Sequence, residues 1–85
     1  MKEVRILGVY INERVKAAER IQPILTKYGC AIRTRLGLHT TDSAYAEDTG
    51  LILLELTGEP EECLQLENEL LLIDDLDVQK MVFKR

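Results

Sequence analysis

The stretch VRILGVYI, residues Val4–Ile11, is rich in β-branched residues and has apolar side chains at both odd and even positions. Such a segment is typical of a β-strand, and apolar residues on both of its faces indicate a strand in the centre of a sheet. The stretch LILLELT, residues Leu51–Thr57, has the same character and is interrupted only by Glu55. Together the two stretches predict the central strands of one sheet.

A helix is predicted after the first of these strands. Asn12 is a good N-cap residue, and Gly29 stands where a helix C-cap favours a left-handed residue. Pro23 lies inside the segment, where it removes one backbone hydrogen bond and should kink the helix near Glu19. Between the caps, apolar residues recur at helical spacing, at Val15, Ala18, Ile21 or Gln22, Leu25 and Tyr28.

The remaining elements follow from the same patterns. Residues Cys30–His39 alternate between apolar and polar and predict a half-buried strand, followed by a polar loop over 40–49. Pro60 suits the first turn of a second helix, which runs to about Ile73. A last strand is predicted over Leu76–Phe83.

The predicted order is strand, helix, strand, strand, helix, strand. With short right-handed crossovers this order gives an α+β, ferredoxin-like βαββαβ fold, with two helices on one face of a four-stranded antiparallel sheet. The length of 85 residues is that of one small domain, so we expect a single domain over residues 1–85.

The other face of this sheet is expected to be uncovered and apolar. An exposed apolar strip of this size usually marks an interface, so we expect a homo-oligomer, a dimer or tetramer, formed through the open sheet face or the sheet edges. The alternative is a monomer whose loop over 40–49 folds back over the sheet. The residues expected on this face are Leu51 and Leu53, either Leu7 and Val9 or Ile6 and Tyr10, and, at its edge, Arg33 and Arg35.

Composition excludes several classes of protein. No apolar run approaches the ~20 residues of a membrane span, and no secretory signal is visible, so we expect a cytoplasmic protein. Residues 42–77 hold twelve acidic residues and no Lys or Arg, which disfavours direct nucleic-acid binding because the block would repel phosphates. Two cysteines cannot form a disulfide framework and are expected to be free thiols, most simply as small buried hydrophobic residues.

Catalytic motifs are missing from the sequence. There is no Gly-rich phosphate loop, no CxxC and no HExxH. Cys30 and His39 stand at opposite ends of one predicted strand, about 30 Å apart, so they cannot act as a nucleophile–base pair within one subunit. We therefore predict no enzyme, no cofactor and no metal site within one chain. A metal site shared between subunits, from His39 with Cys30 or Cys63, stays open as an alternative.

Several segments resemble a family of small bacterial ACT-like proteins named iron-only hydrogenase system regulators. The matching segments are Asn12–Arg14, Ile32–His39, Gly50–Leu56 and Val78–Arg85, and Arg35-Leu36-Gly37 is the most specific piece. The resemblance implies the same βαββαβ fold, oligomers and a regulatory role with no established ligand.

The resemblance and the uncovered face together predict a small oligomeric regulatory or ligand-sensing ACT-like module without a DNA-binding motif of its own. A partner protein could supply DNA binding. The candidate ligand-binding residues are Asn12, Arg35, Gly37 and His39. The alternative function is a metal- or effector-binding sensor that uses His39 with a cysteine from a neighbouring subunit.

Overall fold

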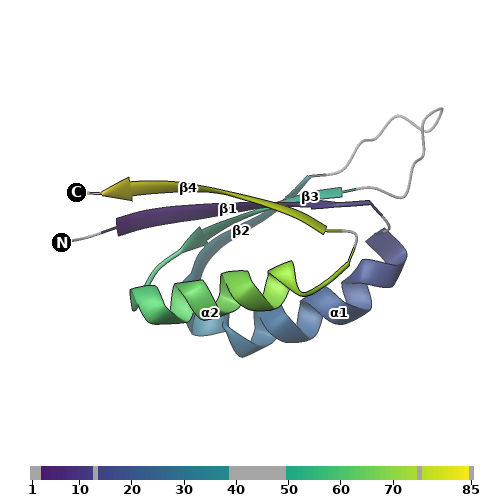
Figure 1. Cartoon of the computed structure of the whole chain (residues 1–85), viewed down its shortest axis with the longest axis horizontal. Coiled ribbons are helices and arrows are strands. Elements are labelled where there is room, and N and C mark those ends of the chain that lie inside the picture. The colour runs from purple at the N-terminus through teal and green to yellow at the C-terminus, as the bar shows by residue number, and fades with distance from the viewer. Residues whose placement is uncertain (1–2, 13, 39–49, 75, 85) are drawn as a thin grey trace.

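The computed structural model describes residues 3–12, 14–38, 50–74 and 76–84 of the chain (Figure 1). The predicted order of helices and strands is confirmed, with a single turn of 3-10 helix added before the second strand. The elements are β1 (Glu3–Ile11), α1 (Arg14–Lys27), the 3-10 turn η1 (Gly29–Ala31), β2 (Ile32–Leu38), β3 (Gly50–Leu56), α2 (Pro60–Leu71) and β4 (Leu76–Lys84).

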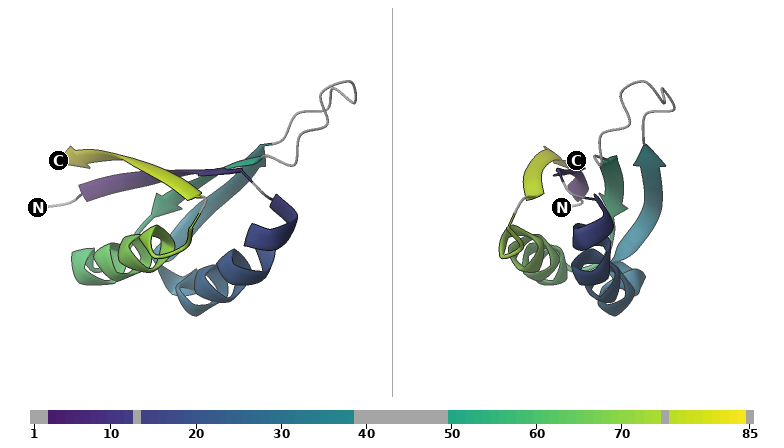
Figure 2. Two further views of the ribbon diagram at one scale, coloured as in Figure 1. Left: turned by 45° about the vertical axis from the view of Figure 1, so that its right-hand side comes forward. Right: turned by 90° about the vertical axis from the view of Figure 1, so that its right-hand side faces the viewer.

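The strands form one sheet in the order β2-β3-β1-β4, and every neighbouring pair is antiparallel. The two stretches that are apolar on both faces, β1 and β3, are therefore the central strands, as predicted. Both helices lie on the same side of the sheet, which is clear in both views of Figure 2. The α+β, ferredoxin-like fold is thus confirmed.

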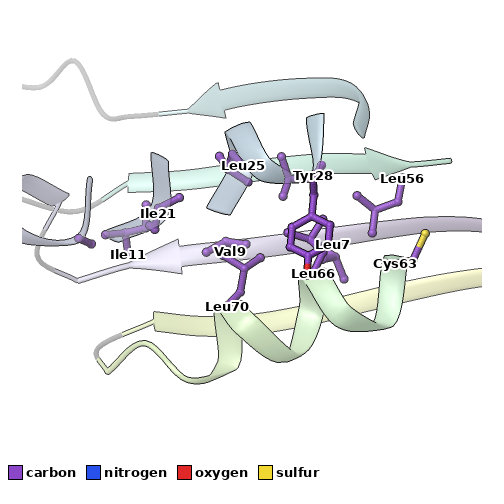
Figure 3. Close-up of a cluster of buried hydrophobic side chains, with 12 residues drawn as sticks. Leu7, Val9, Ile11, Ile21, Leu25, Tyr28, Leu56, Cys63, Leu66 and Leu70 are labelled. Carbon is purple, nitrogen blue, oxygen red and sulfur yellow. The ribbon is translucent and has the colours of Figure 1, made fainter. Parts of the chain in front are cut away.

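The core lies between the helices and the sheet (Figure 3). In β1, Leu7, Val9 and Ile11 point towards the helices, and Leu54 and Leu56 do so in β3. The helices fill the space above them with a set of almost fully buried side chains, which are Ala17, Ile21, Leu25, Cys63, Leu66 and Leu70, together with Tyr28 after the end of α1. The burial of these aliphatic side chains is the main term that stabilises the fold.

The turn between α1 and β2 differs from the prediction. Gly29 does not cap α1 in the left-handed conformation, because it begins the turn η1, and the amide of Ala31 donates to the carbonyl of Tyr28 at 2.9 Å. Cys30 lies in this turn and is exposed, so the expectation of a buried cysteine at the start of a strand is wrong at this position. Cys63 is buried, as expected.

A β-bulge near the start of β2 changes which side chains face the helices. Ile32 pairs with Leu56, but the next paired residue is Thr34, which lies opposite Glu55. Arg33 is the extra residue, and it interrupts the alternation that the sequence pattern assumes. The bulge lets Ile32 pack against the core while Thr34 points to the uncovered side.

The bulge overturns the predicted position of Arg35. This residue pairs with Leu54, whose side chain is buried under the helices, so Arg35 lies on the helix side of the sheet and not on the uncovered face. Its guanidinium donates a hydrogen bond to the side-chain oxygen of Gln22 in α1 at 3.3 Å. Leu36, opposite Leu53, takes the outward position instead.

Candidate functional site

The side of the sheet opposite the helices carries several exposed apolar side chains, and we call it the open face. Of the two sets considered for β1, the structure selects Ile6 and Tyr10, and it places Leu51 and Leu53 of β3 beside them as predicted. No described element covers this surface (Figure 2). Its outer positions are strongly exposed, with Tyr10 at 42%, Leu36 at 49%, Phe83 at 51% and Met81 at 53%.

The predicted ligand-binding residues do not form one cluster. Asn12 follows the last residue of β1, and Gly37 pairs with Ile52 towards the same end of the sheet. Arg35 is engaged with Gln22 on the helix side, and His39 lies outside the described residues. A side chain at Gly37 would meet open space, so the surface there is shallow. Neither of the two described pockets includes Asn12, Arg35 or Gly37, and this ligand site stays a prediction.

A pocket of about 550 Å³ lies at the opposite end of the sheet, where β1 begins and β3 leads into α2. Its wall includes Arg5, Arg33 and Cys63, together with Glu3 and Glu55. The Cys63 thiol donates to the carbonyl of Thr57 at 3.6 Å. Burial raises the pKa of Cys63, so this thiol is protonated and unreactive at neutral pH.

A buried ion pair connects the sheet to α2 beside this pocket. The Arg5 guanidinium donates from Nη1 to Oε1 of Glu67 at 3.5 Å, and the two side chains are only 10% and 11% exposed. Arg5 also pairs with Glu3 at 3.3 Å, and Lys80 of β4 pairs with the second oxygen of Glu67 at 3.2 Å. The Arg5 Nε is buried without a hydrogen-bond partner in the described part of the chain.

Sequence reasoning missed this network. The signal was present, because Arg5 interrupts the apolar stretch Val4–Ile11 and Glu67 falls on the same helix face as Leu66 and Leu70. A basic and an acidic residue at two predicted core positions are expected to pair, since an isolated buried charge is very costly.

A second polar cluster joins the two helices. The Tyr28 hydroxyl donates to Oε2 of Glu69 in α2, and Lys27 pairs with the same carboxylate at 3.2 Å. The hydrogen bond from Tyr28 and then Lys27 lower the pKa of Glu69, and the bond to Glu69 raises the pKa of both Tyr28 and Lys27. This cluster lies at the edge of the core, because Tyr28 is buried and Lys27 is exposed, and it links the end of α1 to α2.

Metal-binding geometry is missing from the described residues. No group of three or more His, Cys, Asp or Glu side chains lies close enough together there to hold a metal ion. No helix in the described ranges is long and apolar enough to cross a membrane.

Comparison with known proteins finds solved structures with a similar fold and does not assign the chain to a family. No family profile matches the chain, and no curated protein matches it. Among solved structures, the uncharacterized protein TM1266 from Thermotoga maritima superposes with a TM-score of 0.82 at 21% identity, over 98% of this chain and 100% of that one. At this identity the likeness shows a shared fold.

Two PII-like proteins share the fold more distantly. CPII from Thiomonas intermedia K12, a nitrogen regulatory PII-like protein bound to ADP, AMP and bicarbonate, has a TM-score of 0.60 at 10% identity, over 99% of this chain and 93% of that one. A PII-like signaling protein of Thermus thermophilus has a TM-score of 0.59 at 12% identity, over 95% of this chain and 85% of that one.

Proposed function

We propose that this protein is a small, non-catalytic regulatory module that senses a ligand and works as a homo-oligomer. The observation on which the proposal rests is the open face, where Met81 and Phe83 at one corner and Tyr10 and Leu36 at the opposite corner expose apolar surface. Soluble domains rarely leave so large an apolar patch without a binding role.

Two further observations support a regulatory role. The PII-like proteins that share the fold are described as regulatory or signaling proteins, and one of them binds small anionic molecules. The segments around Arg35-Leu36-Gly37 resemble the ACT-like hydrogenase system regulators, so we place the chain near that group of regulators in function. The proposed ligand surface is the end of the sheet with Asn12 and Gly37, together with Arg35, two residues before Gly37, and His39, two residues after it.

Thermal unfolding with ADP, AMP and bicarbonate as separate probes tests the ligand part of this proposal. A ligand present at 100 times its Kd stabilises the native state by about 2.7 kcal/mol, which gives a clear rise in Tm. We expect the rise to be lost in Arg35→Gln and kept in Arg20→Gln, which removes an exposed arginine of α1 away from the predicted site.

Sedimentation velocity tests the assembly part. We expect a mass of at least twice 9.7 kDa at micromolar concentration, and a shift in the distribution of species when an effective probe is added. A protein that sediments as a monomer and responds to none of the probes would contradict the proposed function.

A further inference from the structure

The apolar side chains of the open face form a diagonal band. At one corner of the sheet, Val4 pairs with Phe83 and Ile6 with Met81, which joins β1 to the end of β4. Gly8 and Leu53 occupy the centre as direct partners. At the opposite corner the band ends on Leu36 of β2, Leu51 of β3 and Tyr10 of β1. We call the residues named in this paragraph the apolar band.

The other two corners of the open face are polar, and each is paired within its own chain. In one corner the Thr34 hydroxyl donates to the carboxylate of Glu55 at 2.9 Å. In the diagonally opposite corner the side-chain amide of Gln79 donates to the carboxylate of Asp77 at 3.2 Å. Among the described residues of this face, Glu55 and Asp77 are the charged ones, and neither belongs to the apolar band.

This arrangement has the anatomy of a protein–protein interface. Stable interfaces have an apolar centre depleted of charge and a polar rim that keeps its hydrogen bonds. Four strands spaced about 4.8 Å apart, each of seven to nine residues, give a face of roughly 19 by 25 Å before side-chain relief is counted. The flat outline of that face is about 475 Å² per copy, and side-chain relief brings it towards the ~800 Å² of accessible surface that each partner buries in a standard dimer.

We propose that the apolar band is an isologous interface, and that its occupant is the open face of a second copy of this chain. A two-fold axis that lies in the interface plane and runs along the band superposes the band on its copy. All residues of the band then pack near this axis, with Leu53 and Gly8 at its centre. The band has no charge that would select a different partner by electrostatic complementarity. This inference deepens the proposed function, since it rests on assembly and names the surface that assembles.

Lysine substitutions at the two ends of the band test the interface. Leu36→Lys and Met81→Lys each place a charge at an outer position that is half-exposed in the single chain, so neither change disturbs the core. Leu72→Lys is the matched control, because Leu72 is an 83% exposed leucine after α2 and lies off the sheet. Far-UV circular dichroism confirms that each variant has folded.

We expect the wild type and Leu72→Lys to sediment at twice the monomer mass and to unfold at a Tm that rises with protein concentration. A dimer that binds its partner only in the native state must show this dependence. Leu36→Lys and Met81→Lys should each sediment as monomers at the same concentration, with a Tm independent of concentration.

Two outcomes would overturn the interface. A wild type that is monomeric up to high micromolar concentration would show that the band does not bind a second copy. Dimers that survive both sheet variants and dissociate in Leu72→Lys would place the contact on α2, and the proposed regulatory function would still stand. If both sheet variants are monomers and the dimeric wild type responds to no ligand probe, the result supports the interface and counts against ligand sensing.

Discussion

The guanidinium of Arg5, on the central strand β1, lies 3.5 Å from the carboxylate of Glu67 on α2, inside the layer between helix and sheet. Removing Glu67 leaves the buried Arg5 guanidinium only partly compensated, by Glu3, and breaking a buried pair in this way costs about 3 kcal/mol. We therefore expect Glu67→Met to lower the free energy of unfolding by about that amount in urea denaturation.

A double variant separates the ion pair from the packing around it. Replacing both members by apolar residues, as in Arg5→Met with Glu67→Met, removes the uncompensated charge and should recover most of the stability lost in the single variant. If the double variant is instead less stable than Glu67→Met alone, an uncompensated Arg5 charge is not the cause of the stability lost in the single variant.

Gly58, just before α2, has a φ of 94°. A residue with a side chain costs about 1–2 kcal/mol in the left-handed region, and the nearest atom to an added Cβ, in Glu62, is at an ordinary 3.6 Å. Gly58→Ala should therefore destabilise the protein by about 1 kcal/mol through backbone conformation alone. Gly29→Ala is the control: its added methyl group meets no atom within 4 Å, and chemical denaturation should show almost no change.

Pro23 lies in the middle of α1 and has no amide hydrogen to donate to the carbonyl of Glu19. Proline in a helix interior costs up to about 3 kcal/mol relative to alanine. Since Pro23 is exposed, Pro23→Ala removes no core contact, and we expect the free energy of unfolding to rise by about 1–3 kcal/mol. A fall in stability on denaturant titration would mean that α1 needs the proline to pack against the sheet.

The cluster of Tyr28, Lys27 and Glu69 makes stability depend on pH at both extremes. The pKa of Glu69 is lowered, so its contribution is present above the ordinary glutamate value of 4.5 and is lost as the pH falls through its folded pKa. The pKa values of Tyr28 and Lys27 are raised from 10.0 and 10.5, so their contribution is present below about pH 10 and is lost at higher pH.

We expect Glu69→Gln to lower the Tm at neutral pH and to flatten both the acidic and the alkaline limbs of the Tm profile. Glu61→Gln is the matched control, because Glu61 is an exposed glutamate on the same helix. If the Tm profile of Glu69→Gln against pH parallels that of the wild type, this cluster does not cause the pH dependence of stability.

The fold could be predicted because the hydrophobic pattern of the sequence indicates the type and the order of the helices and strands. Val4–Ile11 and Leu51–Thr57 are apolar on both faces, which is typical of strands in the centre of a sheet, and both are central in the structure. The predictions that were wrong concern local irregularities, which a hydrophobic repeat of two residues in strands or about 3.6 residues in helices does not reveal. The bulge at Arg33 adds one residue to one strand, and the turn at Gly29–Ala31 replaces a simple helix cap.

The candidate site was predictable only in part, for a related reason. The sequence predicts Leu51 and Leu53 of β3 on the open face, and the structure confirms them. For β1 the sequence leaves two sets open, and the structure selects Ile6 and Tyr10. The positions of Arg35 and of the buried pair of Arg5 and Glu67 depend on which residue lies opposite which, and the pattern along a single segment does not specify this pairing.

The bulge at Arg33 also fixes what kind of molecule the outward side of the sheet can attract. If β2 continued from Ile32 in regular alternation, Arg33 and Arg35 would point outward and Leu36 would turn inward. The same sequence would then present two cations where it now presents a leucine, a surface suited to a phosphate or an acidic peptide. One additional residue in β2 therefore decides whether this face is apolar, as the proposed self-association requires, or cationic, as an anion site would require.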